Sequence, residues 1–190
     1  MRAERNLYYA YQSLTMLFSA TNKLQVRGDK HLGDMTIRQV LTILAILYAP
    51  NKNASVNQIA RQLGTTKQSA AQIVDALRKK GCVSVAPSEK DKRSVSVTVT
   101  AAGEKVMRES SIRVNEFITD IFIDFTSEEL ASFHTLLKKL YHTVYIGDGR
   151  DFVASFLKQE NLMLRDSYIS GLVNEGKSFV QQLSDDNNNT

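Results

Sequence analysis

The sequence predicts a mainly α-helical protein with one small β-hairpin. Along much of its 190 residues, apolar side chains recur three and four positions apart, which is the spacing of one face of a helix. Several of these stretches begin at a serine or threonine, residue types that commonly cap the start of a helix. After Gly81 the apolar period changes to two, as in a strand with one buried face.

Two short helices joined by a tight turn are predicted after residue 54. Ser55 and Gln58 form a capping box, in which the hydroxyl accepts from a free amide and the glutamine reaches back to the cap amide. The first helix ends at Gly64, which tolerates the left-handed conformation of a helix end. Thr66 caps the second helix. Its inward face carries Ala70, Ile73, Val74 and Leu77.

A hairpin with a charged tip follows this helix pair. Residues 94–99 alternate strictly, so that three valines, Val95, Val97 and Val99, share one face of a strand. Between Val85 and that strand lies the charged segment 88–93, preceded by Pro87. Helix, tight turn, helix and a hairpin with a basic tip together predict a winged helix-turn-helix.

The outer face of the second helix is polar. Gln68, Gln72, Asp75 and Lys79 lie opposite the apolar stripe, and Ser69 flanks them. Glutamine can pair with adenine through two hydrogen bonds in the major groove, and serine or threonine can contact several bases. Exposed glutamines are more often simply solvated, but the flanking motif and the basic hairpin tip favour base reading. The predicted DNA contacts are Thr66, Lys67, Gln68, Ser69, Gln72 and Lys79 on the helix, and Lys90, Asp91, Lys92 and Arg93 on the tip.

The charge distribution supports a nucleic-acid partner. Residues 36–108 contain 12 Lys and Arg against 4 Asp and Glu, whereas residues 109–190 contain 7 against 13. The net charge of +4 therefore conceals a basic middle and an acidic remainder. Such a protein can bind the phosphates of a nucleic acid with one face only.

Residues 63–103 resemble the MarR (multiple antibiotic resistance regulator) family of bacterial transcription regulators. The most specific part is Asp91-Lys92-Arg93, followed by the alternating valines and Thr100-Ala101-Ala102-Gly103, within a similarity that extends over residues 7–145. The resemblance implies that Asp91 orients Arg93 and that Arg93 enters a minor groove. It also implies a homodimer on a pseudo-palindromic operator in double-stranded DNA. We expect a repressor whose DNA affinity is modulated by a small-molecule effector.

Helices outside this motif are expected to form a dimerisation region. A first helix is predicted over residues 7–24, followed by a turn-rich link, Gly28–Asp34, and a helix from the capping box at Thr36 to Tyr48, which Pro50 terminates. Thr100 caps a long helix, and residues 126–129 cap the next, whose apolar stripe continues to Val144. In the resembled family the first helix and these last two join in the dimer.

The predicted organisation has four parts. An N-terminal dimerisation helix occupies residues 1–35, the winged helix-turn-helix residues 36–100, and C-terminal dimerisation helices residues 101–147. Residues 148–190 add a helical extension, with amphipathic patterns within 151–183 and a polar tail expected to be disordered.

Several other classes of protein are disfavoured. Cys82 is the single cysteine, which favours a buried thiol over a redox sensor, and the three histidines, His31, His134 and His142, lack close ligand spacing. No metal or cofactor is therefore expected. No nucleophile-base pair or phosphate-binding glycine loop indicates an enzyme. No apolar run suggests a membrane span, so we expect a cytoplasmic protein. The alternative function is a winged-helix protein-interaction module, which would not require the basic middle.

Overall fold

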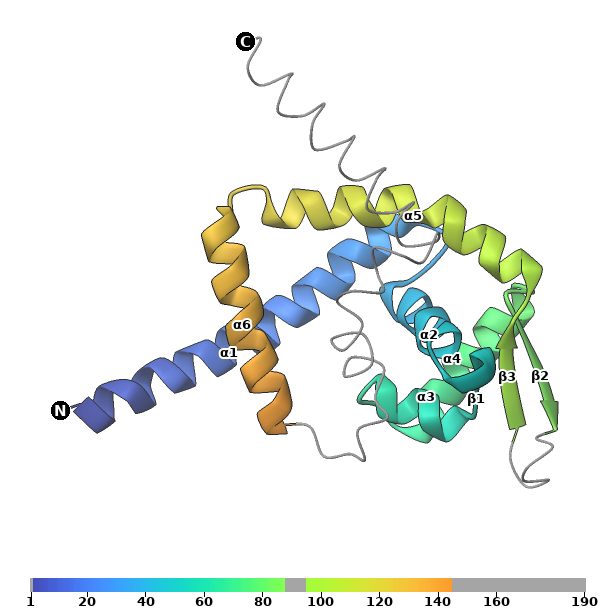
Figure 1. The fold of residues 1–190 in the computed structure, drawn as a ribbon, viewed down its shortest axis with the longest axis horizontal. Coiled ribbons are helices and arrows are strands. Elements are labelled where there is room, and N and C mark those ends of the chain that lie inside the picture. Colours follow the sequence, from blue (N-terminus) through green and yellow to red (C-terminus); the bar gives the residue numbers. More distant parts are fainter. Residues whose placement is uncertain (1, 88–94, 145–190) are drawn as a thin grey trace, which may run out of the picture. The chain divides into compact units, whose positions relative to one another are not determined.

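The computed structural model describes residues 2–87 and 95–144, with side chains from Glu4 onward (Figure 1). The chain divides into two compact units, Met1–Ile37 and Arg38–Thr190. The predicted contacts on the hairpin tip and the predicted extension of residues 148–190 lie outside the described residues.

The first unit consists mainly of one long helix, α1 (Arg2–Leu32). The prediction of a helix over residues 7–24 followed by a link from Gly28 was wrong in its end point, because the helix continues through Gly28. A single glycine costs only about 1 kcal/mol in a helix interior, and neighbouring residues can offset this. The helix ends before Gly33, whose φ is 67°. The Asp29 carboxylate then accepts the Ile37 amide at 2.7 Å and fixes the turn.

In the second unit, three α-helices precede the hairpin: α2 (Ile37–Leu47), α3 (Val56–Gln62) and α4 (Lys67–Lys79), of which α3 and α4 form the helix-turn-helix. The predicted capping box of Ser55 and Gln58 is confirmed, because both reciprocal bonds are present. The turn passes through Gly64 with a φ of 58°, as predicted for this helix end. Fully buried side chains from the three helices meet in one core: Ile43, Ile46, Ile59, Ala70 and Leu77.

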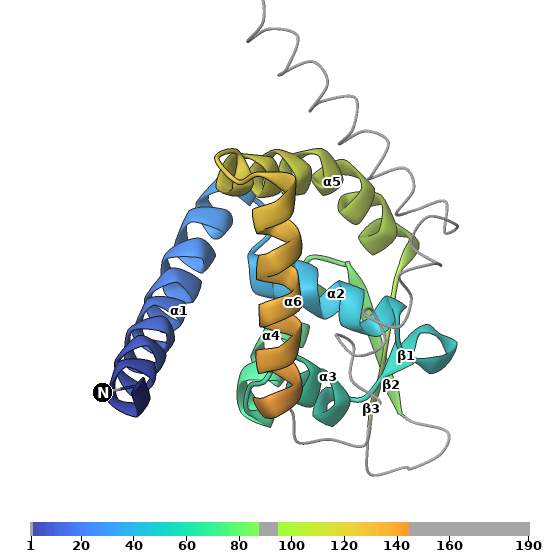
Figure 2. The same ribbon diagram turned by 60° about the vertical axis from the view of Figure 1, so that its left-hand side comes forward.

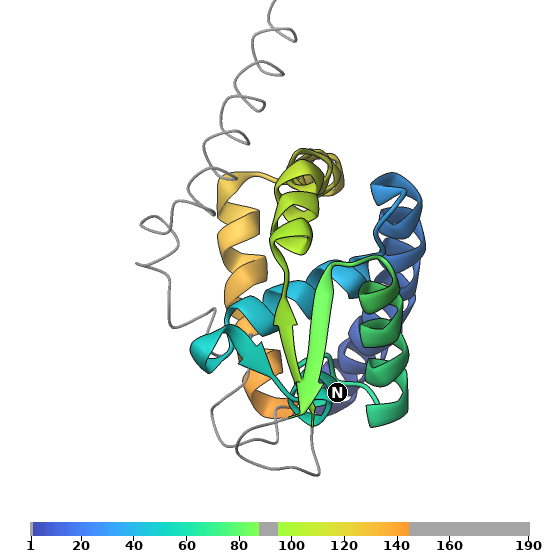
Figure 3. The same cartoon turned by 90° about the vertical axis from the view of Figure 1, so that its right-hand side faces the viewer.

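The sheet has three antiparallel strands in the order β1-β3-β2, which Figure 3 shows side by side. The predicted hairpin is confirmed as β2 (Val83–Pro87) and β3 (Val95–Val99), with Val85 opposite Val97. The third strand, β1 (Asn53–Ala54), was not predicted from the sequence. It is too short to show a period, and its pairing with β3 is non-local. A 3₁₀ turn, η1 (Pro50–Lys52), leads into it with Asn51 at φ 59°.

Two further helices follow the sheet, α5 (Ala101–Phe122) and α6 (Ser127–Val144), and Figure 2 shows the turn between them. Thr126 and Glu129 cap α6 reciprocally, since each backbone amide donates to the other side chain. Phe122, Phe125 and Phe133 pack edge to face or tilted around this turn. No residue of α6 is buried. Its exposed apolar residues are Leu130, Phe133, Leu136, Leu137, Leu140 and Val144.

Candidate nucleic-acid interface

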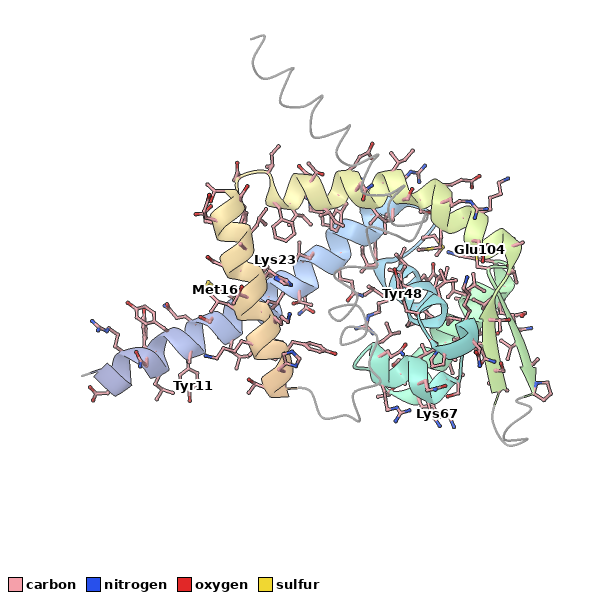
Figure 4. All side chains as sticks on the ribbon, in the orientation of Figure 1. Tyr11, Met16, Lys23, Tyr48, Lys67 and Glu104 are labelled. Atoms are coloured by element: carbon pink, nitrogen blue, oxygen red, sulfur yellow. The ribbon has the colours of Figure 1, made fainter. Side chains whose placement is uncertain are left out.

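The start of α4 is fixed by the cap that the sequence predicted. The Thr66 hydroxyl accepts from the Ser69 amide at 3.1 Å, and it also donates to the Ser69 hydroxyl at 3.0 Å. The first bond satisfies one free backbone amide at the start of the helix, and the two bonds hold both hydroxyls at the amino-terminal end of α4. Lys67 follows the cap and points away from the helices (Figure 4).

Burial on α4 separates an inner face from an outer face. Ala70, Val74 and Leu77 are buried, as the sequence predicted, and Ile73 is half-buried. Gln68 and Gln72, one turn apart, are exposed on the opposite side. Each of the helix positions predicted to contact DNA lies outside the core. Thr66, Lys67, Gln68, Gln72 and Lys79 are exposed, and Ser69 is half-buried.

The outer face of α4 also carries a carboxylate with two cationic partners. Asp75 accepts from Arg78 Nη2 at 2.7 Å and from Lys79 Nζ at 2.8 Å. The hydrogen bond from Lys79, followed by that from Arg78, holds the pKa of Asp75 below its ordinary value. Asp75 is therefore ionised at neutral pH. The sequence placed Asp75 and Lys79 on this face, but the pairing of Asp75 with Arg78 and Lys79 was not predicted, although spacings of three and four residues are the usual signal for it.

The hairpin presents its own polar surface next to the core. The hydroxyls of Ser84 and Thr98, which face each other across β2 and β3, share a hydrogen bond of 2.7 Å. Val83 and Val97 are buried, so the base of the hairpin is held by the core. The four predicted contacts between β2 and β3 in the sequence fall outside the described residues: Lys90, Asp91, Lys92 and Arg93. Their predicted roles remain predictions.

The far end of α4 is anchored by contacts that are distant in sequence. Lys80 Nζ donates to the Oε1 atom of Gln39, a buried residue of α2, at 2.9 Å. The Thr100 hydroxyl donates to the Gly81 carbonyl at 2.6 Å and accepts the Gly103 amide at 3.0 Å. The Thr100 amide in turn donates to the Cys82 carbonyl at 3.0 Å. These bonds join three elements at one place: the end of α4, the base of the hairpin and the start of α5.

Cys82 lies in this junction and is buried, as the sequence predicted. Burial raises the pKa of its thiol, and the nearby charge of Lys80 opposes the rise. The thiol is therefore protonated at neutral pH and weakly reactive.

Among residues 2–87 and 95–144, no group of three His, Cys, Asp or Glu side chains could hold a metal ion. In the same ranges, no helix is long and apolar enough to cross a membrane.

A model of the MarR family matches residues 33–94, the stretch that contains the helix-turn-helix, β1 and β2. This chain has a MarR-family winged helix. Its fold agrees with the predicted class, since the protein is mainly helical with a small antiparallel sheet. The matched stretch includes α4, the helix whose outer face the sequence predicted to contact DNA.

Relatives with known names extend the similarity beyond the motif. The transcriptional activatory protein BadR of Rhodopseudomonas palustris is 27% identical over 152 residues, covering 77% of this chain and 83% of BadR. A mutant of MarR from E. coli, complexed with operator DNA, aligns with a TM-score of 0.58 at 21% identity, covering 68% of this chain and 96% of the other. PcaV from Streptomyces coelicolor, in complex with its natural ligand, aligns with a TM-score of 0.60 at 15% identity, covering 68% and 92%.

Proposed function

We propose that the protein is a homodimeric regulator of transcription that binds double-stranded DNA in a sequence-specific manner, as a repressor. The observation that carries this proposal is the outer face of α4. Gln68 and Gln72 stand exposed in a row near the start of a capped helix, within a MarR-family winged helix. The amino-terminal part of a recognition helix is the part that meets base edges.

Charge separates this proposal from a module that only binds other proteins. The basic surplus falls within residues 36–108, which include the entire helix-turn-helix and the hairpin. Phosphate contacts need such a surplus, because each neutralised phosphate releases counterions and adds affinity. On the tip, we propose that Arg93 reaches the minor groove or its phosphates and that Asp91 orients it.

The proposed dimer rests on the apolar surface of α6. This helix buries none of its residues, while six large apolar side chains lie exposed along it. A helix with such a surface is rarely stable without a partner. In the dimer, the two copies of α4 would enter successive major grooves about 34–36 Å apart, which requires an operator with matching half-sites.

We further propose that a small ligand modulates DNA binding. The support is the structural neighbour PcaV, which was solved with a natural ligand. A ligand releases DNA only if it binds one arrangement of the two recognition helices more tightly than the other. The relative BadR is named a transcriptional activatory protein, so the proposed repressor is distinguished from an activator by whether transcription from the operator falls or rises when the protein binds.

Selection from a pool of random double-stranded DNA tests the proposal. The full-length protein is expected to enrich a motif with two related half-sites centred about one helical turn apart. Binding to that motif should weaken steeply with salt, and competition by random DNA should be poor. A pool that shows no common motif after selection, with equal affinity for all sequences, would overturn the proposal and favour a protein-interaction module.

A further inference from the structure

The outer face of α4, which we propose reads DNA, carries a negatively charged residue, Asp75. A carboxylate is unexpected on a surface that approaches phosphates. Asp75 lies on the same outer face as Gln68, Gln72 and Lys79. A carboxylate that enters a groove between phosphates is repelled by them, and it also holds the cations of Arg78 and Lys79 at 2.7 and 2.8 Å. For general affinity, both effects are unfavourable.

The repulsion is offset only where DNA supplies a hydrogen-bond donor. A carboxylate accepts hydrogen bonds and donates none when it is ionised. In the major groove the donors are the N4 amine of cytosine and the N6 amine of adenine. Adenine also presents its N7 acceptor next to its amine, which suits an amide such as Gln72 and repels a carboxylate. Cytosine presents the amine without that acceptor.

We propose that Asp75 is a specificity residue that accepts from the N4 amine of a cytosine in each half-site. This inference rests on the proposed function, since it requires that α4 lies in the major groove from its amino-terminal part as far as Asp75, nine residues after the Thr66 cap. Arg78 and Lys79, which are exposed at the side chain by 57% and 72%, are free to turn toward phosphates when the amine replaces them on the carboxylate. Asp75 thus lowers affinity for DNA in general and restores it at the correct base.

The spacing along the helix places this cytosine. Asp75 follows Gln72 by three residues, which is about 4.5 Å along the axis at roughly 1.5 Å per residue. Successive base pairs are about 3.4 Å apart. The cytosine is therefore expected one or two base pairs from the position that Gln72 reads, on either strand.

The matched variants are Asp75→Asn, Asp75→Ala and Glu109→Gln. Glu109 forms a comparable pair with Lys105 at 3.7 Å on α5, so Glu109→Gln removes the same charge away from the recognition face. Each full-length variant is first checked for an unchanged melting temperature. Selection from random DNA is then repeated, and affinity is measured on the selected site, on the same site with C·G replaced by T·A, and on random DNA.

Thymine presents an O4 acceptor where cytosine has its amine, so the substituted site should repel an ionised Asp75. For the wild type and Glu109→Gln, we expect the selected site to be preferred over the T·A site by roughly tenfold, the ratio that about 1.4 kcal/mol gives. In both Asp75 variants this ratio should fall close to one, while binding to random DNA becomes tighter. Asp75→Asn should gain a preference for adenine at the same position, since asparagine pairs with adenine.

Two results would overturn the inference. If both Asp75 variants keep the C·G preference and bind all sequences more tightly by the same factor, Asp75 only holds its cations. If the selected motif has no cytosine within two base pairs of the position that depends on Gln72, Asp75 reads no base. Both results leave the proposed function standing, whereas the absence of any selected motif overturns the proposed function itself.

Discussion

Lys80 Nζ donates to Oε1 of Gln39 across 2.9 Å, and this bond joins the end of the recognition helix to α2 although 41 residues separate the two in sequence. Gln39 is buried, with 8% of its surface exposed. A buried amide that loses its hydrogen-bond partner lowers the stability of the folded state. The bond therefore helps to hold the end of α4 in place against α2.

Replacing Lys80 with methionine should therefore destabilise the protein by about 1 kcal/mol, since most of the alkyl chain is kept while the hydrogen bond to Gln39 is lost. The neighbouring Lys79→Met is the control, because Lys79 pairs only at the surface, where such pairs contribute little. Urea unfolding of both variants measures the difference. Equal loss in the two would show that the bond to Gln39 contributes nothing specific.

Two glycines should respond to alanine for different reasons. A Cβ at Gly103 would collide with the backbone carbonyl of Cys82 and lie 2.9 Å from Val99 Cγ1, so Gly103→Ala should cost about 3 kcal/mol or more. Gly64 has open space but a φ of 58°, so Gly64→Ala should cost only about 1–2 kcal/mol of backbone strain. Thermal and urea unfolding test the order. A smaller loss at Gly103 than at Gly64 would contradict the close approach.

Cys82 should make stability fall at alkaline pH. Burial raises the pKa of its thiol above the ordinary value of 9.0, so the folded state holds the proton where the unfolded state has lost it. The resulting stability is complete below the unfolded pKa and is lost as pH rises from about 9 through the folded pKa. Urea unfolding from pH 7 to 10 should show a steeper decline for the wild type than for Cys82→Ala. Parallel profiles would refute the coupling.

Gln72→Ala should weaken binding to the selected site by about 1–3 kcal/mol and relax the preference at one position in each half-site. The reason is the loss of a base-reading amide on the exposed face of α4. Competition binding against single-base variants of the site measures it. An equal loss on every sequence would mean that Gln72 contacts only the backbone of DNA.

Truncation after Gly147 should weaken the proposed dimer. The removed segment includes apolar residues at helical spacing, among them Leu164, Tyr168, Leu172 and Leu183, which require burial, and its net charge is negative, so docking beside phosphates is disfavoured. The exposed apolar face of α6 is a surface that it can cover. We expect dissociation at a higher protein concentration or earlier melting, with base preference intact. An unchanged dimer with unchanged melting would instead favour a docking arm for another protein.

Local signals in the sequence predicted most of the motif. The caps at Ser55, Thr66 and Thr100 depend on residues three positions away, so a single stretch of sequence contains both partners. The inner face of α4 follows equally from helical spacing. By contrast, β1 exists through its pairing with a strand more than 40 residues later, and the bond from Lys80 to Gln39 spans a similar separation. Neither leaves a local pattern. The continuation of α1 past Gly28 was missed because a glycine weakens a helix without ending it.

The bonds of Thr100 have a consequence for how this hairpin can change. The Thr100 amide donates to the Cys82 carbonyl and its hydroxyl donates to the Gly81 carbonyl, which joins the two strands at the base of the hairpin. The same hydroxyl accepts from the Gly103 amide and so caps the start of α5. Pro87 and Val95 also pair with each other across β2 and β3, so insertions between them add chain between two ends that are already joined, at an entropic cost that grows only slowly with length. Variation in the tip can alter how far the hairpin extends toward a partner without altering the direction in which α5 leaves the sheet.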